Sequence, residues 1–147
     1  MHKRDDLIKA FREYFKNSAG KYGIEMAFLF GSYAFGYEKI ESDIDIAIAL
    51  HESLESDKSV VFDIISNLSY DLNKIFAKEI SVLFIDREFS KPMLFYNAII
   101  HGVPLYISNK EKYISFVLKA LNEMEDFKLF GEKWQLEVIE KRIAKAT

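Results

Sequence analysis

The chain has 147 residues, of which 50% are hydrophobic, and its formal net charge is -3 at pH 7. This length suits one domain with a sizeable core, and the charge gives no reason to expect a nucleic acid or a membrane surface as a partner. Cysteine is absent, which excludes disulfide bridges, thiolate metal sites and thiol nucleophiles. Because the N-terminus carries charges throughout and no long apolar run occurs, we expect a soluble, cytoplasmic protein without a membrane segment.

Three elements are predicted in the first third of the chain. Apolar residues recur at helical spacing over residues 4–18, which predicts an amphipathic helix that ends near Gly20 and Gly23. The apolar run at residues 24–30 predicts a buried strand. After a turn or short helix, a stretch at residues 43–50 that is rich in isoleucine predicts a second strand.

The middle of the chain alternates between helix and strand. Residues 57–76 follow helical spacing and predict a second long helix, and residues 79–85 predict a third strand. A further helix is predicted over residues 91–100, and it stops at Gly102. This alternation is typical of a sheet whose strands are connected by helices.

The last third begins with a short predicted strand at residues 103–107, which Pro104 makes an edge strand or a terminal piece of the sheet. Residues 110–145 follow helical spacing, and Gly131 predicts a break between two helices. The apolar positions of this tail fit two interpretations. They form a surface for a partner, or the two helices fold as a hairpin onto their own domain.

These elements together predict a mixed α/β (α+β) fold, in which helices flank a small mixed sheet and a helical tail follows. We expect a single domain over residues 1–147, with its core at about residues 24–107 and the C-terminal helices at about residues 110–145. No segment rich in proline, glycine and serine marks a linker, and no internal repeat is present.

Two carboxylates one residue apart suggest the chemistry of the protein. Asp43 and Asp45 open the second predicted strand, where alternation points both side chains to the same face of the sheet. Their repulsion is relieved by a raised pKa or by a cation between them, and Mg²⁺ prefers such oxygen ligands and is often shared with substrate phosphates. Gly31 and Ser32 directly follow the first predicted strand, where a turn can present backbone N–H groups and a hydroxyl to a phosphate.

Each of these features also has a purely structural interpretation. A glycine and a serine after a strand are common turn residues, and aspartates at a strand start can be capping groups or solubilising charges at a sheet edge. The combination is more specific than either part, because one short segment supplies both a phosphate cradle and a cation site. We therefore favour a nucleotide site formed by this segment.

The segment "GSYAFGYEKIESDIDIAI" resembles the signature of the minimal nucleotidyltransferases, within the DNA polymerase β-like superfamily. The similarity continues in "ISVLFID" and "NAIIHGVPLY", so that it covers roughly residues 27–107. This resemblance implies the nucleotidyltransferase fold and Mg²⁺-dependent transfer of a nucleoside monophosphate from a nucleoside triphosphate, without an arm that binds nucleic acid. The most similar members are antitoxins that adenylylate a tyrosine of a HEPN-type ribonuclease toxin with ATP.

The resemblance assigns roles to five residues of this chain. Gly31 and Ser32 would hold the triphosphate, Asp43 and Asp45 would bind the metal ions as catalytic residues, and Ser42 would support the turn between them. All five belong to the signature segment. The resemblance therefore implies that a single loop between two strands carries most of the nucleotide site.

One position departs from the family pattern. Members of the family carry a third carboxylate on the later strand, and this chain has Ser81 there. A serine at its normal pKa is a poor metal ligand and cannot act as a general base. Glu79 shares the predicted face of Ser81 and offers a substitute carboxylate, or it is an ordinary solvated residue; Asp86 should face away from Ser81.

The sequence thus supports a main hypothesis and two alternatives. The main hypothesis is an adenylyltransferase antitoxin that uses ATP and Mg²⁺ to modify a hydroxyl group of a HEPN-type toxin. Because of Ser81, the first alternative is a catalytically weakened or inactive antitoxin that neutralises its toxin by binding. The second alternative is transfer of the nucleotide to a small molecule, although no second domain that could hold one is predicted.

Overall fold

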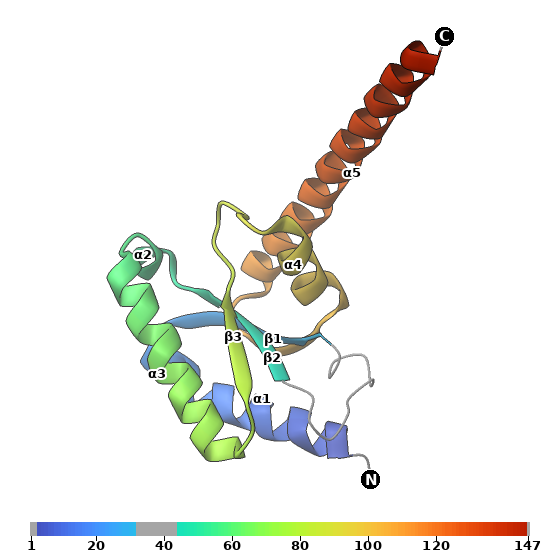
Figure 1. The fold of residues 1–147 in the computed structure, drawn as a ribbon. Helices are drawn as coiled ribbons and strands as arrows, with labels where there is room; N and C mark the ends of the chain where they lie inside the picture. Colours follow the sequence, from blue (N-terminus) through green and yellow to red (C-terminus); the bar gives the residue numbers. More distant parts are fainter. Residues whose placement is uncertain (1–2, 32–43, 147) are drawn as a thin grey trace.

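The computed structural model describes residues 3–31 and 44–146, with the side chains of all of these except residues 3, 127–130, 132 and 146. The chain forms a mixed α/β fold in which helices and strands are interspersed (Figure 1), as the sequence predicts. In chain order the elements are α1 (Lys3–Tyr22), β1 (Ile24–Phe30), β2 (Ile44–Leu50), α2 (Glu52–Glu55), α3 (Lys58–Phe76), β3 (Ile80–Phe84), α4 (Pro92–Tyr96), the π-helical turn η1 (Asn97–His101), β4 (Val103–Ile107) and α5 (Lys110–Ala146).

The four strands form one mixed sheet with the order β3-β2-β1-β4. β1 pairs antiparallel with both β2 and β4, whereas β2 and β3 are parallel. Parallel neighbours need a crossover connection, which α2 and α3 provide here. β4 lies at an edge of the sheet, as predicted from Pro104, because proline has no N–H group for a second neighbour.

Each face of the sheet carries its own apolar cluster, because successive side chains of a strand point to opposite faces. On one face, α1 and α3 pack against the strands, and the buried residues include Phe11, Phe15, Leu29, Ile46, Ile48 and Leu68. On the other face, α4, η1 and α5 pack around Met26, Phe28, Ala47, Ile85, Phe95 and Phe116. Figure 1 shows α3 and α4 on opposite sides of β3, which lies between the two layers.

The first helix ends where the sequence predicts, near Gly20 and Gly23. The periodic segment covers residues 4–18, and α1 continues from it through Gly20 to Tyr22. Gly20 is exposed there, and a glycine in a helix costs only about 1 kcal/mol relative to alanine. The helix ends before Gly23, whose φ of 69° is in the left-handed region that favours glycine.

The crossover from β2 to β3 begins with a helix that the sequence does not reveal. α2 has only four residues, which is too short for a helical periodicity to be recognised. The long helix α3 agrees closely with the predicted range. The carboxylate of Asp57 accepts hydrogen bonds from the N–H groups of Ser59 (3.0 Å) and Val60 (3.3 Å), and thereby caps the first turn of α3.

The predicted helix over residues 91–100 consists of two parts. α4 is an α-helix of five residues, and the π-helical turn η1 follows it directly and ends before Gly102. A side chain at Gly102 would collide with the backbone, because its Cβ would lie 2.1 Å from the carbonyl oxygen of Ala98. Only glycine therefore fits at this position. The helical segment stops there, as predicted, and β4 begins directly after it.

The C-terminal tail corrects one prediction. Gly131 does not separate two helices, since α5 is one continuous helix of 37 residues that passes through it. The predicted hairpin is therefore wrong, and the far half of α5 extends away from the sheet (Figure 1). One glycine costs about 1 kcal/mol, which the other residues of a long helix can offset. None of the described helices combines the length and the apolar character that crossing a membrane requires.

A buried carboxylate joins the start of α5 to the sheet. Glu25 is 5% exposed, although it lies within the apolar strand β1, at the point where the pairing of β1 with β2 shifts register. Its carboxylate accepts from Lys112 of α5 (2.5 Å) and from Arg87 (3.3 Å), which also contacts Glu55 of α2 (3.0 Å). Such a network holds three elements together, because burying the carboxylate without its partners would cost several kcal/mol.

Candidate active site

A cavity of about 550 Å³ lies where β1 ends and β2 and β3 begin. Its walls combine backbone, polar and apolar groups from both halves of the chain. The lining residues are Phe30, Gly31, Asp45, Ser81, Val82, Leu83, Leu94 and Asn97. The cavity thus contains every described residue to which the sequence assigns a role in the nucleotide site, except Glu79.

Asp45 lies between two neighbouring strands at the start of β2. It is opposite Phe30 of the antiparallel strand β1 and opposite Ser81 of the parallel strand β3. Alternation places Asp45 on the same face as Ala47, which belongs to the cluster under α4 and α5. Asp45 is partly exposed, whereas Ile44 and Ile46 on either side of it are fully buried. The sheet therefore anchors this residue and presents its carboxylate to the cavity.

Gly31 approaches the carboxylate of Asp45 more closely than any other residue type could. A Cβ atom at position 31 would lie 2.6 Å from Oδ2 of Asp45, well inside van der Waals contact. The backbone of Gly31 also has a φ of 78°, in the region that favours glycine. The sequence predicts that a glycine here lets the backbone approach a ligand. The structure adds that its missing side chain leaves room for the carboxylate.

Three residues of the predicted site lie outside the described residues. They are Ser32, Ser42 and Asp43, all of which belong to the segment between β1 and β2. The convergence of Asp43 with Asp45, and the roles of the two serines, therefore stay predictions. Asp45 and Gly31 mark the two ends of that segment, and both line the cavity.

Ser81 occupies the position at which the resemblance implies a third carboxylate. It is exposed, lines the cavity and is the direct neighbour of Asp45 in the parallel pairing of β2 and β3. Glu79 precedes β3, and its carbonyl oxygen accepts a hydrogen bond from the N–H group of Ile44 (3.1 Å). Its side chain is exposed and does not belong to the described cavity lining. A catalytic role for Glu79 stays a prediction.

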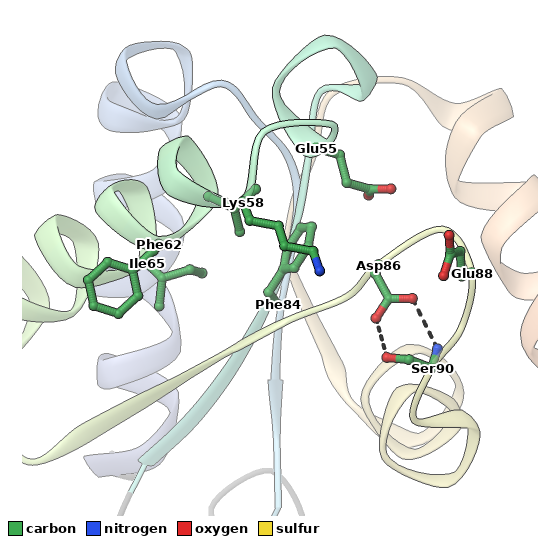
Figure 2. A pocket seen from close by; sticks show the side chains of 9 residues that line it. Glu55, Lys58, Phe62, Ile65, Phe84, Asp86, Glu88 and Ser90 are labelled. Atoms are coloured by element: carbon green, nitrogen blue, oxygen red, sulfur yellow. Dashed lines mark hydrogen bonds between the residues drawn. The ribbon is translucent and has the colours of Figure 1, made fainter.

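Asp86 points to a different part of the molecule. It lines a second cavity, of about 520 Å³, together with Glu55, Lys58 and Phe84. Figure 2 shows its carboxylate beside Ser90, whose N–H group (3.0 Å) and hydroxyl group both donate to it. This agrees with the prediction that Asp86 faces away from Ser81. The hydrogen bonds hold the loop after β3 in place, so that this carboxylate serves the fold.

Sequence reasoning missed one wall of the first cavity. Leu94 of α4 and Asn97 at the start of η1 line it, although they follow Ser81 by more than ten residues. Both side chains are exposed, and η1 is a π-helical turn, a feature that often occurs at functional sites. No local spacing relates these two residues to Asp45. Only the packing of α4 onto the sheet brings them together.

The described residues fit a divalent cation only in part. Among residues 3–31 and 44–146, no group of three or more histidine, cysteine, aspartate or glutamate residues could hold a metal ion. Asp45 supplies the hard oxygen ligand that Mg²⁺ prefers, and it lines the same cavity as the backbone of Gly31. These donors suit a cation that is held jointly by protein carboxylates and by the phosphates of a nucleotide.

Residues 10–111 match the family described as "Polymerase beta, Nucleotidyltransferase", which is well over half of the chain. The chain belongs to the polymerase beta nucleotidyltransferase family. The matched range includes all four strands of the sheet and the whole described lining of the first cavity. The resemblance inferred from the signature segment is therefore confirmed at the level of the family.

One similar protein comes from Methanocaldococcus jannaschii. "Putative protein adenylyltransferase MJ0435" of Methanocaldococcus jannaschii is 40% identical to this nucleotidyltransferase over 63 residues. The match covers 43% of this chain and 61% of the relative, so it spans less than two thirds of either protein. The activity named for the relative is therefore not assigned to this chain on this match alone.

Solved structures with the same fold include two toxin–antitoxin complexes. One, described as a toxin–antitoxin with AMP-PNP, contains a chain with a TM-score of 0.61 and 17% identity, over 94% of this chain and 99% of that one. The other is a tri-AMPylated HEPN toxin of Shewanella oneidensis in complex with an MNT antitoxin, with a TM-score of 0.62 and 14% identity over 90% and 98%. At these identities the similarity establishes the nucleotidyltransferase fold alone.

Proposed function

We propose that this nucleotidyltransferase is an antitoxin that transfers AMP from ATP to a tyrosine hydroxyl of a HEPN-type toxin in the cytoplasm. The observation that carries the proposal is the cavity of about 550 Å³ that Gly31 and Asp45 line together, where a backbone N–H group and a carboxylate can face one nucleotide. The names of the similar proteins support AMP as the transferred group and a HEPN toxin as the acceptor.

Different residues of the cavity would have different roles in such a reaction. The N–H group of Gly31 would donate to the triphosphate, and Asp45, with Asp43 as predicted from the sequence, would hold Mg²⁺. When bound, Mg²⁺ neutralises the charge that develops on the phosphates. The apolar wall of Phe30, Leu83 and Leu94 would exclude water from one side of the nucleotide.

The transfer itself forms one bond and breaks another. The acceptor oxygen bonds to the α-phosphorus of ATP, while the bond from that phosphorus to the oxygen bridging to the β-phosphate breaks. Pyrophosphate leaves, and AMP stays on the acceptor. The proton of the acceptor hydroxyl goes to water, because the exposed Ser81 cannot accept it at its normal pKa. We therefore expect slow turnover.

The decisive experiment combines the purified chain, Mg²⁺, α-labelled ATP and a candidate HEPN-type toxin, and measures the intact mass of both proteins. A gain of one AMP on the toxin is the expected result. Asp45→Asn should reduce the transfer rate roughly 10²–10³-fold, as is typical when one group that stabilises developing charge is lost. Asp86→Asn is the matched control, because this carboxylate lines the other cavity and should leave the rate unchanged.

Ser81 favours one alternative function. Directly beside Asp45, the sheet carries a hydroxyl where the family pattern implies a carboxylate. An antitoxin with this departure could keep its nucleotide and neutralise the toxin by binding alone. A stable complex that binds ATP but never modifies the toxin, and that still neutralises it with Asp45→Asn, would support this alternative against transfer.

A further inference from the structure

α5 carries an apolar face that its own domain does not cover. Its first half packs on the sheet through Phe116 and Ala120, which belong to the cluster under α4. A different face exposes six large aliphatic side chains, each with between 44% and 60% of its surface in contact with solvent. These residues, called the α5 stripe below, are Ile114, Leu118, Leu121, Leu136, Ile139 and Ile143.

The α5 stripe is narrow, and it consists of two groups of three residues, Ile114 to Leu121 and Leu136 to Ile143. Each residue of an α-helix turns the chain by about 100°, so the six positions fall within a sector of about 60°. A seam of this width is typical of helices that pair along their length, whereas a helix that packs on a globular core usually has a wider apolar face. The stripe runs for roughly 44 Å along the helix at 1.5 Å per residue.

The spacing of the α5 stripe is the same when it is read from either end. Going from Ile114 to Ile143, the steps are four, three, fifteen, three and four residues. An antiparallel copy of the same helix therefore places Ile114 opposite Ile143, Leu118 opposite Ile139, and Leu121 opposite Leu136. Every contact occurs twice about a two-fold axis, as an interface between identical chains requires.

We propose that the α5 stripe is a homodimer interface, in which two copies of this chain pair through antiparallel α5 helices. At about 100 Å² of exposed surface per side chain, the six residues contribute roughly 600 Å² from each copy and about 1,200 Å² in all, the lower end of the range for specific interfaces. This inference does not depend on the proposed function, because the cavity contains no residue of the stripe.

The shape of the molecule favours the antiparallel arrangement over the parallel one. The far half of α5 extends away from the sheet (Figure 1), so an antiparallel copy can lie along it with its own domain at the opposite end. A parallel pair would bring both domains to the same end.

The first test uses cysteine as a marker, since the chain has none of its own. A mixture of Leu121→Cys and Leu136→Cys chains should form a cross-link between copies under mild oxidation. Leu121→Cys alone should not, because an antiparallel pair separates its two copies by 15 residues, or roughly 22 Å. Cross-linking of Leu121→Cys to itself, or none in the mixture, overturns the proposal.

The second test measures mass by sedimentation velocity over a range of concentrations. The wild-type chain should be a dimer, and Leu118→Glu should raise its dissociation constant at least tenfold. Trp134→Glu is the matched control, because Trp134 is 59% exposed on the same helix but lies on the opposite side from the stripe. Mixing Leu118→Glu with Ile139→Lys chains should restore dimers, since the new charges meet across the seam.

Three results would contradict the proposal in this second test. They are a monomer at every concentration, an equal effect of Leu118→Glu and Trp134→Glu, and a mixture that fails to recover dimers. If the isolated chain is a monomer and Leu118→Glu abolishes binding of the toxin, the α5 stripe belongs to that partner and not to a second copy. Circular dichroism of each variant confirms that α5 remains folded.

Discussion

The two cavities of this protein lie at opposite ends of the parallel strands and use carboxylates in different ways. At one end, Asp45 meets the bare backbone of Gly31, where a Cβ atom would lie 2.6 Å from its carboxylate. At the other end, Asp86 accepts two hydrogen bonds from Ser90, and Glu55 pairs with Arg87. The carboxylate of Asp45 thus lines an open cavity at the first end, whereas those of Asp86 and Glu55 hold the fold together at the second.

This difference shows why the number of acidic side chains around a cavity does not identify an active site. The cavity of Figure 2 has three acidic residues, Glu55, Asp86 and Glu88, whereas the described lining of the other has only Asp45. Hydrogen bonds and ion pairs within the protein already use two of the three. Variants at both ends of the sheet can test this interpretation.

Ser81→Asp should place beside Asp45 the third carboxylate that the family resemblance implies. A general base contributes typically 10²–10⁴-fold, so AMP transfer to the toxin should become roughly 100-fold faster. The measurement is the initial rate with α-labelled ATP. Ser81→Asn is the control of equal size without a charge, and it should give no gain. If both variants leave the rate unchanged, proton removal does not limit the reaction. The cavity at Asp45 then needs no general base at position 81.

Arg87→Met should lower stability and leave the nucleotide site intact. The substitution removes partners from Glu55 and from the buried Glu25, which keeps only Lys112. Because the side chain of Arg87 is 27% exposed, we expect a loss of about 2 kcal/mol, less than for a fully buried pair. Chemical denaturation measures it.

Lys91→Met provides the control for this change, since Lys91 is an exposed residue and its replacement should stay within about 0.5 kcal/mol. ATP affinity should be unchanged in both variants. A tenfold loss of ATP affinity in Arg87→Met would mean that the two ends of the sheet are coupled. The ion pairs of Arg87 would then contribute to the nucleotide site as well as to stability.

Gly31→Ala should weaken ATP binding about tenfold, a change equivalent to 1.4 kcal/mol. The new methyl group would displace the carboxylate of Asp45, and alanine is disfavoured at a φ of 78°. Isothermal titration calorimetry with Mg²⁺ and a non-hydrolysable ATP analogue measures the affinity. Gly20→Ala is the matched control, because no atom lies within 4 Å of the added Cβ. Equal affinities in the two variants would contradict the role given to Gly31.

Tyr22→Phe should have the smallest effect, and one that depends on pH. Burial, together with the hydrogen bond that its hydroxyl donates to Asp71, raises the pKa of Tyr22 above the ordinary value of 10.0. The folded state therefore keeps the proton longer than the unfolded state, so this contribution is fully present below pH 10 and is lost as the pH rises further. The phenylalanine variant should lose about 1 kcal/mol at pH 7.

Unfolding of the two proteins between pH 7 and pH 11 provides the check on Tyr22. The wild-type protein should lose stability above pH 10 more steeply than Tyr22→Phe, so that their difference shrinks. Parallel curves would mean that the hydroxyl group titrates alike in both states. ATP affinity at pH 7 should be the same in both, because Tyr22 and Asp71 join α1 to α3 and line neither cavity.

The sequence predicts elements well where a local pattern decides the structure. The strand at residues 24–30 has the predicted bounds, and Pro104 correctly marks an edge strand. The break at Gly131 is wrong, because a local cost of about 1 kcal/mol does not end a helix that gains along its whole length. Helix α2 is too short to leave a periodic signal.

The candidate site divides in the same way. Gly31 and Asp45 can be predicted, because one segment of the sequence shows both the end of β1 and the start of β2. Ser81 can be predicted because the family pattern marks its position. Leu94 and Asn97 cannot be predicted, since their place in the cavity depends on how α4 packs across the sheet. Glu25 was missed because a single charge in an apolar strand has no partner within its own segment.

The position of β4 in the sheet has a consequence for synthesis on the ribosome. β1 is an inner strand, but its second neighbour is the last strand to be made, more than seventy residues later. Until residues 103–107 have left the ribosome, the growing chain carries the apolar strand β1 with one edge unpaired. Nascent chains that stall before this point should aggregate or recruit chaperones, and pairing over so long a separation should make folding slow.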